Sequence, residues 1–396
     1  MNPPGPDFPP VFDWHSPGRI RFGDGVVSEL PAVVASQGSR ALLVTGASPA
    51  RWDALRGAMA SVMACAGPWT VAGEPTIDAA VRGAAAARDA GADVVVAVGG
   101  GAVIDAAKAI AAFARNPGDP FEHLEVVGRG RPLVHAPLPL VAVPTTAGAG
   151  SEATRNAVLT SPGHRLKVSL RHGGMVPRVA LVDPELTHGL PATVTAHSGM
   201  DALLQLLEPW VSRRAQPMTD ALCEAGLRRV GGALRAVMTA PNPGARATMS
   251  WCSTMGGVVL ANAGLGVVHG FAAPLGGMLT APHGALCAAM GAPGVAANIR
   301  ALEVRRPGSP ALRRYDLAAR WITGCEEATR ADLAPWLAET ARMASVPTLA
   351  GLGLGPCGFS EVVAAAQRSS SMASNPIELT PDELHAALRE AWGAAG

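Results

Sequence analysis

The residues VVVAVGGGAVIDAAK, at positions 94–108, join an apolar strand pattern to three glycines and the start of a helix. A continuous run of valine and alanine is typical of a strand buried on both faces of a parallel sheet. Glycines after such a strand let the backbone approach a diphosphate, and the helix N-terminus that follows offers free N–H groups and a favourable dipole. The glycine spacing is not GxGxxG, so a tight structural turn remains the alternative to a phosphate site.

Strand and helix patterns alternate on both sides of this segment. Apolar runs predict further strands at 41–45, 139–143 and 179–183, with a weak one at 70–71. Helical patterns at 48–64, 76–91 and 99–114 separate these strands. From about residue 188 onward only helical patterns remain. Apolar strands that alternate with helices indicate parallel βαβ units. The chain is therefore predicted to have an α/β domain over 1–187 and an all-helical domain over 188–396.

The composition excludes several classes of protein. The 396 residues carry a net charge of +1 and only 16% are charged, so no basic patch indicates a nucleic acid or an anionic membrane as partner. Residues 247–299 contain no Asp, Glu, Lys or Arg, but glycines and prolines interrupt them, which favours protein interior around a site over a membrane span. The Pro-rich opening MNPPGPDFPP lacks the charged and apolar pattern of a signal segment. Six cysteines without a CxxC pair indicate a reduced, cytoplasmic protein without a thiolate metal site.

A second polar loop follows the strand predicted at 139–143. PTTAGAGSEATRNAVLT, at 144–160, gathers Thr145, Thr146 and Ser151 with glycines at the carboxyl end of a strand, where ligands bind in open α/β sheets. An ordinary capped loop is the alternative. The chain has two lysines, Lys108 and Lys167, against thirty arginines, and both lie in the α/β half. An ammonium that must reach a particular oxygen is not replaceable by a guanidinium, which indicates a specific role for these lysines. The alternative is that the two lysines remain by chance.

The helical half offers four candidate metal ligands. In GMDALLQLLEPW (199–210), Asp201 and Gln205 are four residues apart and so lie on one helix face. His269 and His283 both fall in the uncharged stretch. Oxygen and nitrogen donors of this kind are able to bind a divalent metal. A helix-interior polar pair and two core histidines are the alternative.

Taken together, these segments resemble the iron-containing (group III) alcohol dehydrogenase family, whose fold is dehydroquinate-synthase-like and which is related to the maleylacetate reductases. The motifs that carry the resemblance span nearly the whole chain: GGGAVIDAAK (99–108), PTTAGAGSEAT (144–154), Lys167, DPELTHGLP (183–191), GMDALLQLLEP (199–209), HGFAAPLGGMLTAPHG (269–284) and NPIELTPDEL (375–384). The resemblance implies a diphosphate loop, a nicotinamide and ribose lining, and a metal position. The diphosphate loop, in the α/β dinucleotide-binding domain, would be formed by Gly99, Gly100, Gly101 and Ala102 with Asp105 and Lys108. The nicotinamide and ribose would be lined by Thr145, Thr146, Ser151, Val158 and Lys167. The metal position, in the helical domain, would be formed by Asp201, Gln205, His269 and His283. The resemblance also implies catalytic roles for His269, His283 and Lys167.

Three positions depart from the family pattern. The first metal histidine of the family is Gln205 here, whose neutral amide is a weaker ligand for Fe²⁺ or Zn²⁺, and a second histidine near the substrate is Ala273. The Asp that binds the ribose 2′-hydroxyl in members that prefer NAD is Gly46, with Ser48 and Arg51 nearby. Without that carboxylate a 2′-phosphate is not repelled, so we expect NADPH to be accepted as well as NADH.

The resemblance implies an NAD(P)-dependent oxidoreductase that reduces a small aldehyde or ketone, or runs the reverse, by hydride transfer in the interdomain cleft. A divalent metal or the histidines would polarise the carbonyl. The alternatives are a metal-independent reductase of the maleylacetate reductase type, which SSSMASNPI (369–377) resembles, and a catalytically silent relative that serves as an assembly or regulatory subunit. A lyase like dehydroquinate synthase is disfavoured because 247–299 lacks cations. RIRFGDG (19–25) resembles the family's N-terminal hairpin, which pairs between subunits, so we expect a homodimer.

Overall fold

The computed structural model describes residues 11–240 and 242–393, so the Pro-rich opening segment lies outside the described residues. The chain divides into two compact units, His15–Leu190 and the residues from Pro191 onward, and the second unit also takes in the segment that ends at Trp14. Each unit is described by itself below.

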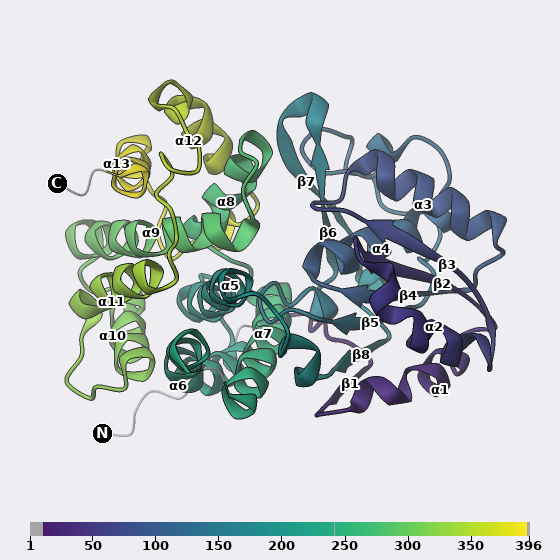
Figure 1. Cartoon of the computed structure of the whole chain (residues 1–396). Coiled ribbons are helices and arrows are strands. Elements are labelled where there is room, and N and C mark those ends of the chain that lie inside the picture. The colour runs from purple at the N-terminus through teal and green to yellow at the C-terminus, as the bar shows by residue number, and fades with distance from the viewer. Residues whose placement is uncertain (1–10, 241, 394–396) are drawn as a thin grey trace. The chain divides into compact units, whose positions relative to one another are not determined.

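The first unit is built on a parallel sheet of six strands in the order β1-β8-β5-β4-β2-β3 (Figure 1). The strands are β1 (Arg19–Phe22), β2 (Arg40–Gly46), β3 (Ala64–Val71), β4 (Val94–Gly99), β5 (Leu140–Pro144) and β8 (Val179–Val182), and the longer helices are α1 (Leu30–Ala35), α2 (Asp53–Ala60), α3 (Ile77–Asp89) and α4 (Gly101–Arg115). Every residue of β4, β5 and β8 is buried, which explains their continuous apolar sequences. The predicted parallel α/β sheet is confirmed.

The strand order reverses beside β2, and this brings the predicted loops together. The chain passes from β2 to β3 on one side and then to β4 on the other side of β2. The register places Thr45 beside Val98 and Gly99 beside Pro144, so the carboxyl ends of β2, β4 and β5 are neighbours. Ligands bind at such a switch point in open α/β sheets.

Two segments differ from the prediction. The strand β6 (Asn156–Ser161), whose residues alternate between buried and partly exposed, pairs with β7 (Leu166–Arg171) in an antiparallel hairpin. We did not predict this hairpin, because the motif at 144–160 looked like one loop. The expected N-terminal hairpin at 19–25 is wrong, because β1 is a single strand that pairs in parallel with β8 and is followed by a short 3₁₀ helix, Val26–Glu29.

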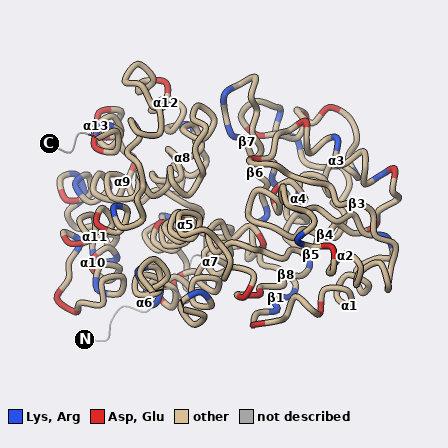
Figure 2. Tube along the Cα trace, viewed as in Figure 1, with Lys and Arg blue, Asp and Glu red and all other residues tan. Residues whose placement is uncertain are grey.

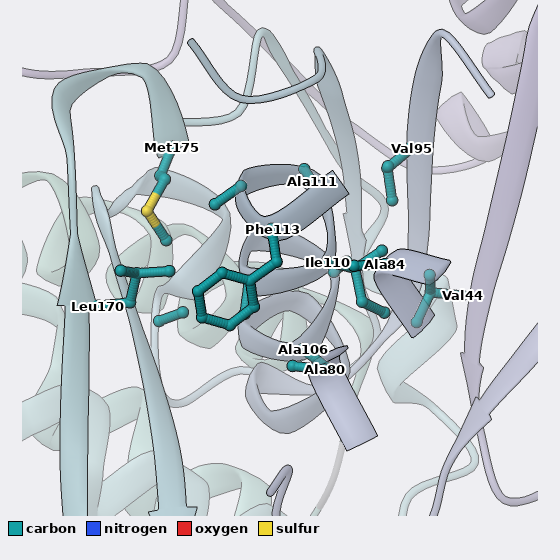
Figure 3. Close-up of a cluster of buried hydrophobic side chains, with 14 of the residues drawn as sticks. Val44, Ala80, Ala84, Val95, Ala106, Ile110, Ala111, Phe113, Leu170 and Met175 are labelled. Carbon is teal, nitrogen blue, oxygen red and sulfur yellow. The ribbon is translucent and has the colours of Figure 1, made fainter. Parts of the chain in front are cut away.

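This unit has two hydrophobic clusters: one lies between the sheet and α3 and α4, and the other lies between the sheet and α1 and α2. Figure 3 shows Ile110 and Phe113 of α4 packed with small residues such as Ala84 of α3. A Cβ on Gly83 would lie 2.5 Å from Ile110 Cδ1, so glycine is what allows the two helices to approach this closely. This packing holds α4, and with it the glycine turn that precedes the helix, closely against α3.

The second unit is helical, as predicted (Figure 1). Its helices are α5 (Ala192–Val211), α6 (Pro217–Thr239), α7 (Pro243–Ala263), α8 (Val267–Met278), α9 (His283–Arg305), α10 (Pro310–Thr323), α11 (Arg330–Met343), α12 (Phe359–Gln367) and α13 (Pro381–Trp392). The uncharged residues 247–299 form most of α7, all of α8 and most of α9, which are tan in Figure 2. Most of the side chains of α8 and α9 are buried, as expected for protein interior.

Helix α9 is long and apolar enough to cross a bilayer, with a mean hydropathy of 1.3 over its most apolar window. However, 72% of that window is buried inside the structure. The helices α7 and α8 pass the same test only as a pair, and they are bent by 99° at the break between them. Core helices of soluble proteins have the same length and composition, so these helices carry no argument for a membrane span.

Candidate functional site

Four of the predicted ligand residues meet inside the helical unit. Asp201 and Gln205 lie one turn apart on α5, His269 lies on α8, and His283 is the first residue of α9. The Asp201 Oδ1 atom lies 3.0 Å from Gln205 Nε2, 3.0 Å from His269 Nε2 and 4.0 Å from His283 Nε2. Asp201, Gln205 and His269 are buried, whereas the His283 side chain is 34% exposed. The cluster is thus closed on one side and accessible at His283.

Glu208, which we did not single out from the sequence, holds His269 in place. Its Oε2 atom accepts a hydrogen bond of 2.6 Å from His269 Nδ1, and its Oε1 atom accepts one of 2.7 Å from the backbone N–H of Val268. The carboxylate therefore lies at the N-terminus of α8, where the helix dipole favours a negative charge. Glu208 is seven residues after Asp201, so the charged and polar residues of an otherwise apolar helix share one face. That spacing was the available signal.

The histidine and the carboxylates stabilise each other's charges. Burial opposes a charged His269, but the electrostatic influence of Cys287 and Glu208 and the hydrogen bond to Asp201 raise the pKa of His269 well above its usual value. Burial also opposes ionisation of Asp201, but the hydrogen bond from His269 and the charge of His283 lower the pKa of Asp201. The raised pKa of His269 favours its protonated form, in which the two ring nitrogens donate to Glu208 and to Asp201.

Cys287 is the second residue that we missed, and it lies in the candidate metal cluster. The sequence indicated no thiolate in a metal site, but Cys287 Sγ lies 3.5 Å from His283 Nε2 and is fully buried. Burial opposes ionisation of the Cys287 thiol, but His269 and His283 lower its pKa below the usual value. The signal was its position four residues after His283 on one helix, which a search for CxxC pairs does not detect.

The segment at 369–377 supports the helix that carries His269. Asn375 Oδ1 accepts a hydrogen bond of 3.0 Å from the backbone N–H of Val267, at the start of α8. Asn375 is buried and also exchanges hydrogen bonds with Asn298 of α9. The sequence NPI therefore joins the N-terminus of α8 to α9 in this chain, which helps to fix the relative positions of His269 and His283.

The donor atoms fit a divalent metal. Asp201, His269, His283 and Cys287 each offer one ligand atom, and these four atoms lie within 4.8 Å of one another. One carboxylate, two imidazoles and a thiol are donors that Zn²⁺ and other first-row metals accept. Gln205 contributes less, because its Nε2 faces Asp201 and its Oε1 has no hydrogen-bond partner among the described residues.

Glu208→Gln is expected to weaken metal binding by about 10- to 100-fold, the usual effect of removing the partner of a histidine ligand. A glutamine that still accepts from Val268 N–H presents its NH₂ group to His269 Nδ1, which shifts the imidazole proton to Nε2, the nitrogen that faces Asp201. Zn²⁺ affinity in competition with a chromophoric chelator measures the effect. Glu224→Gln, at an exposed ion pair with Arg228 on α6, is the control. Unchanged Zn²⁺ affinity in Glu208→Gln would contradict this role.

In the α/β unit, the glycine turn lies against the second predicted loop. A Cβ on Gly100 would lie 3.2 Å from Thr146 Oγ1, and one on Gly101 would lie 2.8 Å from Ala149 Cβ. No side chain caps the N-terminus of α4 at Gly100, and the first N–H groups of a helix have no partner within the helix. The turn therefore combines close backbone packing with a helix N-terminus able to bind an anion.

Asp105 and Lys108 tie α4 to the start of β6. Asp105 Oδ2 accepts a hydrogen bond of 2.9 Å from Val158 N–H, and Lys108 Nζ donates to Thr154 Oγ1 at 2.6 Å and to the Asn156 carbonyl at 2.9 Å. Lys108 is fully buried, and burial lowers its pKa to about 8. Both side chains thus hold the loop that carries Thr154 and Val158.

The remaining predicted cofactor residues lie around this loop and at the end of β2. Lys167 on β7 is buried and forms a 3.0 Å ion pair with the partly exposed Glu74. Gly46 ends β2, Ser48 starts the turn that follows, and Arg51 lies over the Trp52 ring at 5.1 Å. Thr145 and Ser151 are buried, and Ala102 lies in the first turn of α4. All the predicted cofactor residues are therefore in one unit, and the metal-type cluster is in the other.

A parallel sheet with a glycine turn at its switch point, joined to a helical unit with a carboxylate–histidine cluster, defines a class of two-domain oxidoreductases. Family models match both units: "Iron-containing alcohol dehydrogenase" over residues 17–184 and "Fe-containing alcohol dehydrogenase family, C-terminal" over residues 195–392. The chain therefore belongs to the iron-containing alcohol dehydrogenase family, whose members are oxidoreductases that act on alcohols and aldehydes.

Individual relatives agree with this assignment. The chain is 34% identical to "Alcohol dehydrogenase 4" of Schizosaccharomyces pombe over 80% of its own length and 73% of that protein. It is 39% identical to "1,3-propanediol dehydrogenase" of Klebsiella pneumoniae, in an alignment that spans 48% of this chain and 49% of that protein. Among solved structures, the iron-containing alcohol dehydrogenase of Thermococcus thioreducens has 27% identity and a TM-score of 0.84, over 96% of this chain and 99% of that one.

Proposed function

We propose that the protein interconverts a small, largely neutral aldehyde or ketone and its alcohol, with NADPH or NADH as the hydride carrier. The observation that carries the proposal is the convergence of Asp201, His269 and His283 within one helical unit of a chain that matches a dehydrogenase family over residues 17–184 and 195–392. Residues 247–299 supply no cation, which disfavours a polyanionic substrate. The relative named as a 1,3-propanediol dehydrogenase supports a small hydroxylated product.

The α/β unit would bind the dinucleotide. The diphosphate would lie at the N-terminus of α4, against Gly100 and Gly101, where the added bulk of a side chain would displace the loop at 145–151. Thr145, Thr146, Ser151, Val158 and Lys167 would line the nicotinamide and ribose. Lys167 is anchored by Glu74, so its ammonium is held rather than free to move.

In the helical unit, each residue of the cluster has a separate task. Asp201 supplies the carboxylate, His269 and His283 supply the imidazoles, and Glu208 orients His269. A divalent metal bound there would act as a Lewis acid on the carbonyl oxygen. Without a metal, His283 is the more exposed imidazole, so it is the group placed to donate a hydrogen bond or a proton to a substrate oxygen.

A metal-independent reductase is the second candidate, and one observation favours it. His269 lies within hydrogen-bond distance of both Asp201 and Glu208, and Gln205 donates a hydrogen bond to Asp201 instead of offering an oxygen ligand. A cluster that satisfies its own charges in this way is able to support hydrogen-bond catalysis without a cation.

The test is a panel of aldehydes and keto acids with NADPH and with NADH, before and after treatment with a chelator and with added Fe²⁺ or Zn²⁺. Activity that is lost on chelation and restored by metal supports the metal-assisted form. Full activity in the metal-free enzyme supports the second candidate. Absence of both turnover and cofactor binding in a fluorescence titration would overturn the oxidoreductase proposal and leave a silent assembly subunit.

Gly46→Asp is expected to lower kcat/KM with NADPH at least about tenfold relative to NADH, equivalent to ~1.4 kcal/mol. A carboxylate at the end of β2 repels the 2′-phosphate and accepts a hydrogen bond from the ribose 2′-hydroxyl. The side chain fits, because a Cβ at Gly46 would make an ordinary 3.8 Å contact with Val103 Cγ2. Gly46→Ala, which adds the same Cβ without the charge, is the control and should affect both cofactors equally. An unchanged NADPH-to-NADH ratio in Gly46→Asp would contradict the assignment.

A further inference from the structure

The cluster has three oxygen and nitrogen donors, and Gln205 does not supply a fourth. The amide points its Nε2 at Asp201 Oδ1, at 3.0 Å. Its Oε1 faces the other way, toward α7, where a Cβ on Gly256 would lie 3.6 Å from it. Gln205 is therefore a hydrogen-bond donor to Asp201 rather than an oxygen ligand that faces the histidines.

Cys287 occupies the remaining side of the cluster. It lies one turn after His283 on α9, so both side chains project from the same helix face. Its Sγ is 3.5 Å from His283 Nε2 and within 4.8 Å of the ligand atoms of Asp201 and His269. The side chain is fully buried, so the sulfur faces the cluster and not solvent.

The separations suit a tetrahedral ion. With bonds of about 2.0–2.3 Å to nitrogen, oxygen and sulfur, ligand atoms of a tetrahedral zinc site lie roughly 3.3–3.8 Å apart. Of the six separations among the four ligand atoms, three are 3.0 Å for Asp201 to His269, 4.0 Å for Asp201 to His283 and 3.5 Å for Cys287 to His283, and the other three are within 4.8 Å. Small side-chain shifts would bring all of them into that range.

The other two buried cysteines of the helical unit have different surroundings. Cys252 Sγ lies 3.8 Å from the Gly226 carbonyl, and Cys223 is buried on α6. Across residues 11–240 and 242–393, the Asp201–His269–His283–Cys287 group is the one cluster of His, Cys and acidic side chains with metal-binding spacing. Cys223 and Cys252 are thus matched controls for Cys287.

We propose that Cys287 is the fourth protein ligand of the metal, so that the site is an Asp–His–His–Cys set. The inference shares one requirement with the metal-assisted form of the proposed function, on which it rests: that the cluster binds a metal. On binding, the thiol releases its proton to solvent and the thiolate sulfur forms the bond to the ion. A soft thiolate favours Zn²⁺ or Co²⁺ over Fe²⁺ compared with a site of oxygen and nitrogen donors alone.

The test is a titration of chelator-treated, reduced protein with Co²⁺, followed by absorption. We expect a thiolate-to-cobalt charge-transfer band in the near ultraviolet that saturates at one Co²⁺ per chain. Cys287→Ser and Cys287→Ala should lose the band and bind Zn²⁺ at least about tenfold more weakly. Cys223→Ser and Cys252→Ser should keep both the band and the affinity.

Three results would overturn the inference: Co²⁺ binding by the wild-type chain without the band, an unchanged band in Cys287→Ser, or no Co²⁺ binding at all. The Co²⁺ titration of the wild-type chain tests the inference even if both Cys287 variants fail to fold. Because the readout is binding, the inference and the proposed function fail separately. A charge-transfer band in a chain without reductase activity supports Cys287 as a ligand and contradicts the proposed function. Reductase activity in a chain that binds no metal supports the proposed function and contradicts Cys287 as a ligand.

Discussion

Asp201→Asn is expected to lower kcat/KM for carbonyl reduction by about 10²–10³-fold, the usual effect of losing one preorganised electrostatic group. The substitution keeps the shape of the side chain but removes the negative charge around which His269, His283 and Gln205 are arranged. Divalent metal affinity should fall in parallel, because the carboxylate is the only anionic oxygen among the four donor atoms. Steady-state kinetics and a Zn²⁺ competition titration measure the two effects.

The control for Asp201→Asn is Asp220→Asn. Asp220 lies in the same helical unit and forms an ion pair with Arg314, but it is not part of the cluster. It should leave kcat/KM and Zn²⁺ affinity unchanged. If Asp201→Asn keeps full activity while its thermal unfolding shows a folded protein, the cluster is not the site of the reaction.

Lys108→Met is expected to lower the free energy of unfolding by about 3–5 kcal/mol, because it leaves a buried carboxylate without its counter-charge. The Lys108 ammonium is fully buried and lies 3.7 Å from Asp105 Oδ1, an atom with no hydrogen-bond partner among the described residues. It also donates to Thr154 and to the carbonyl of Asn156. Urea denaturation of the full chain gives the change.

The pH dependence identifies the cause of that loss. Burial already raises the pKa of Asp105, and removing Lys108 removes a neighbour that lowers it. A carboxyl group with a raised folded-state pKa binds more protons in the folded state, so its destabilisation is relieved as the pH falls. The deficit of Lys108→Met relative to wild type should therefore shrink as the pH falls from neutrality through the raised pKa of Asp105. The double variant Asp105→Asn/Lys108→Met should recover part of the loss. A deficit that is independent of pH would point to lost packing instead.

Much of the α/β unit was predictable, because burial on both faces imposes a simple pattern. The strands β4, β5 and β8 and the centre of β2 are continuously apolar, and the predicted ranges match these strands closely. β3 lies at the edge of the sheet and is only partly buried, so its sequence ACAGPWTV contains small and polar residues and only its last residues looked like a strand. β6 and β7 pair with each other outside the main sheet, and their alternating pattern was hidden in a polar motif.

The candidate site was predictable in part, and the limit is physical. The i, i+4 spacing of Asp201 and Gln205 predicts a shared helix face, and the structure places their side chains in contact. Their meeting with His269, 68 residues from Asp201, depends on how α8 packs beside α5, which no local pattern encodes. Glu208 and Cys287 were missed for the same reason, since each looks like an ordinary core residue until its neighbours are known.

The sequence by itself determined the parallel sheet, the glycine turn, the helical second half and the membership of a dehydrogenase family. These follow from burial patterns and from motifs that are local in the chain. The tertiary structure alone decided which donors face one another: it turned the Gln205 oxygen away, placed Cys287 beside His283 and set Glu208 behind His269. The reason is that ligand chemistry depends on distances of 3–4 Å between side chains on separate helices, and only the packing of those helices sets such distances.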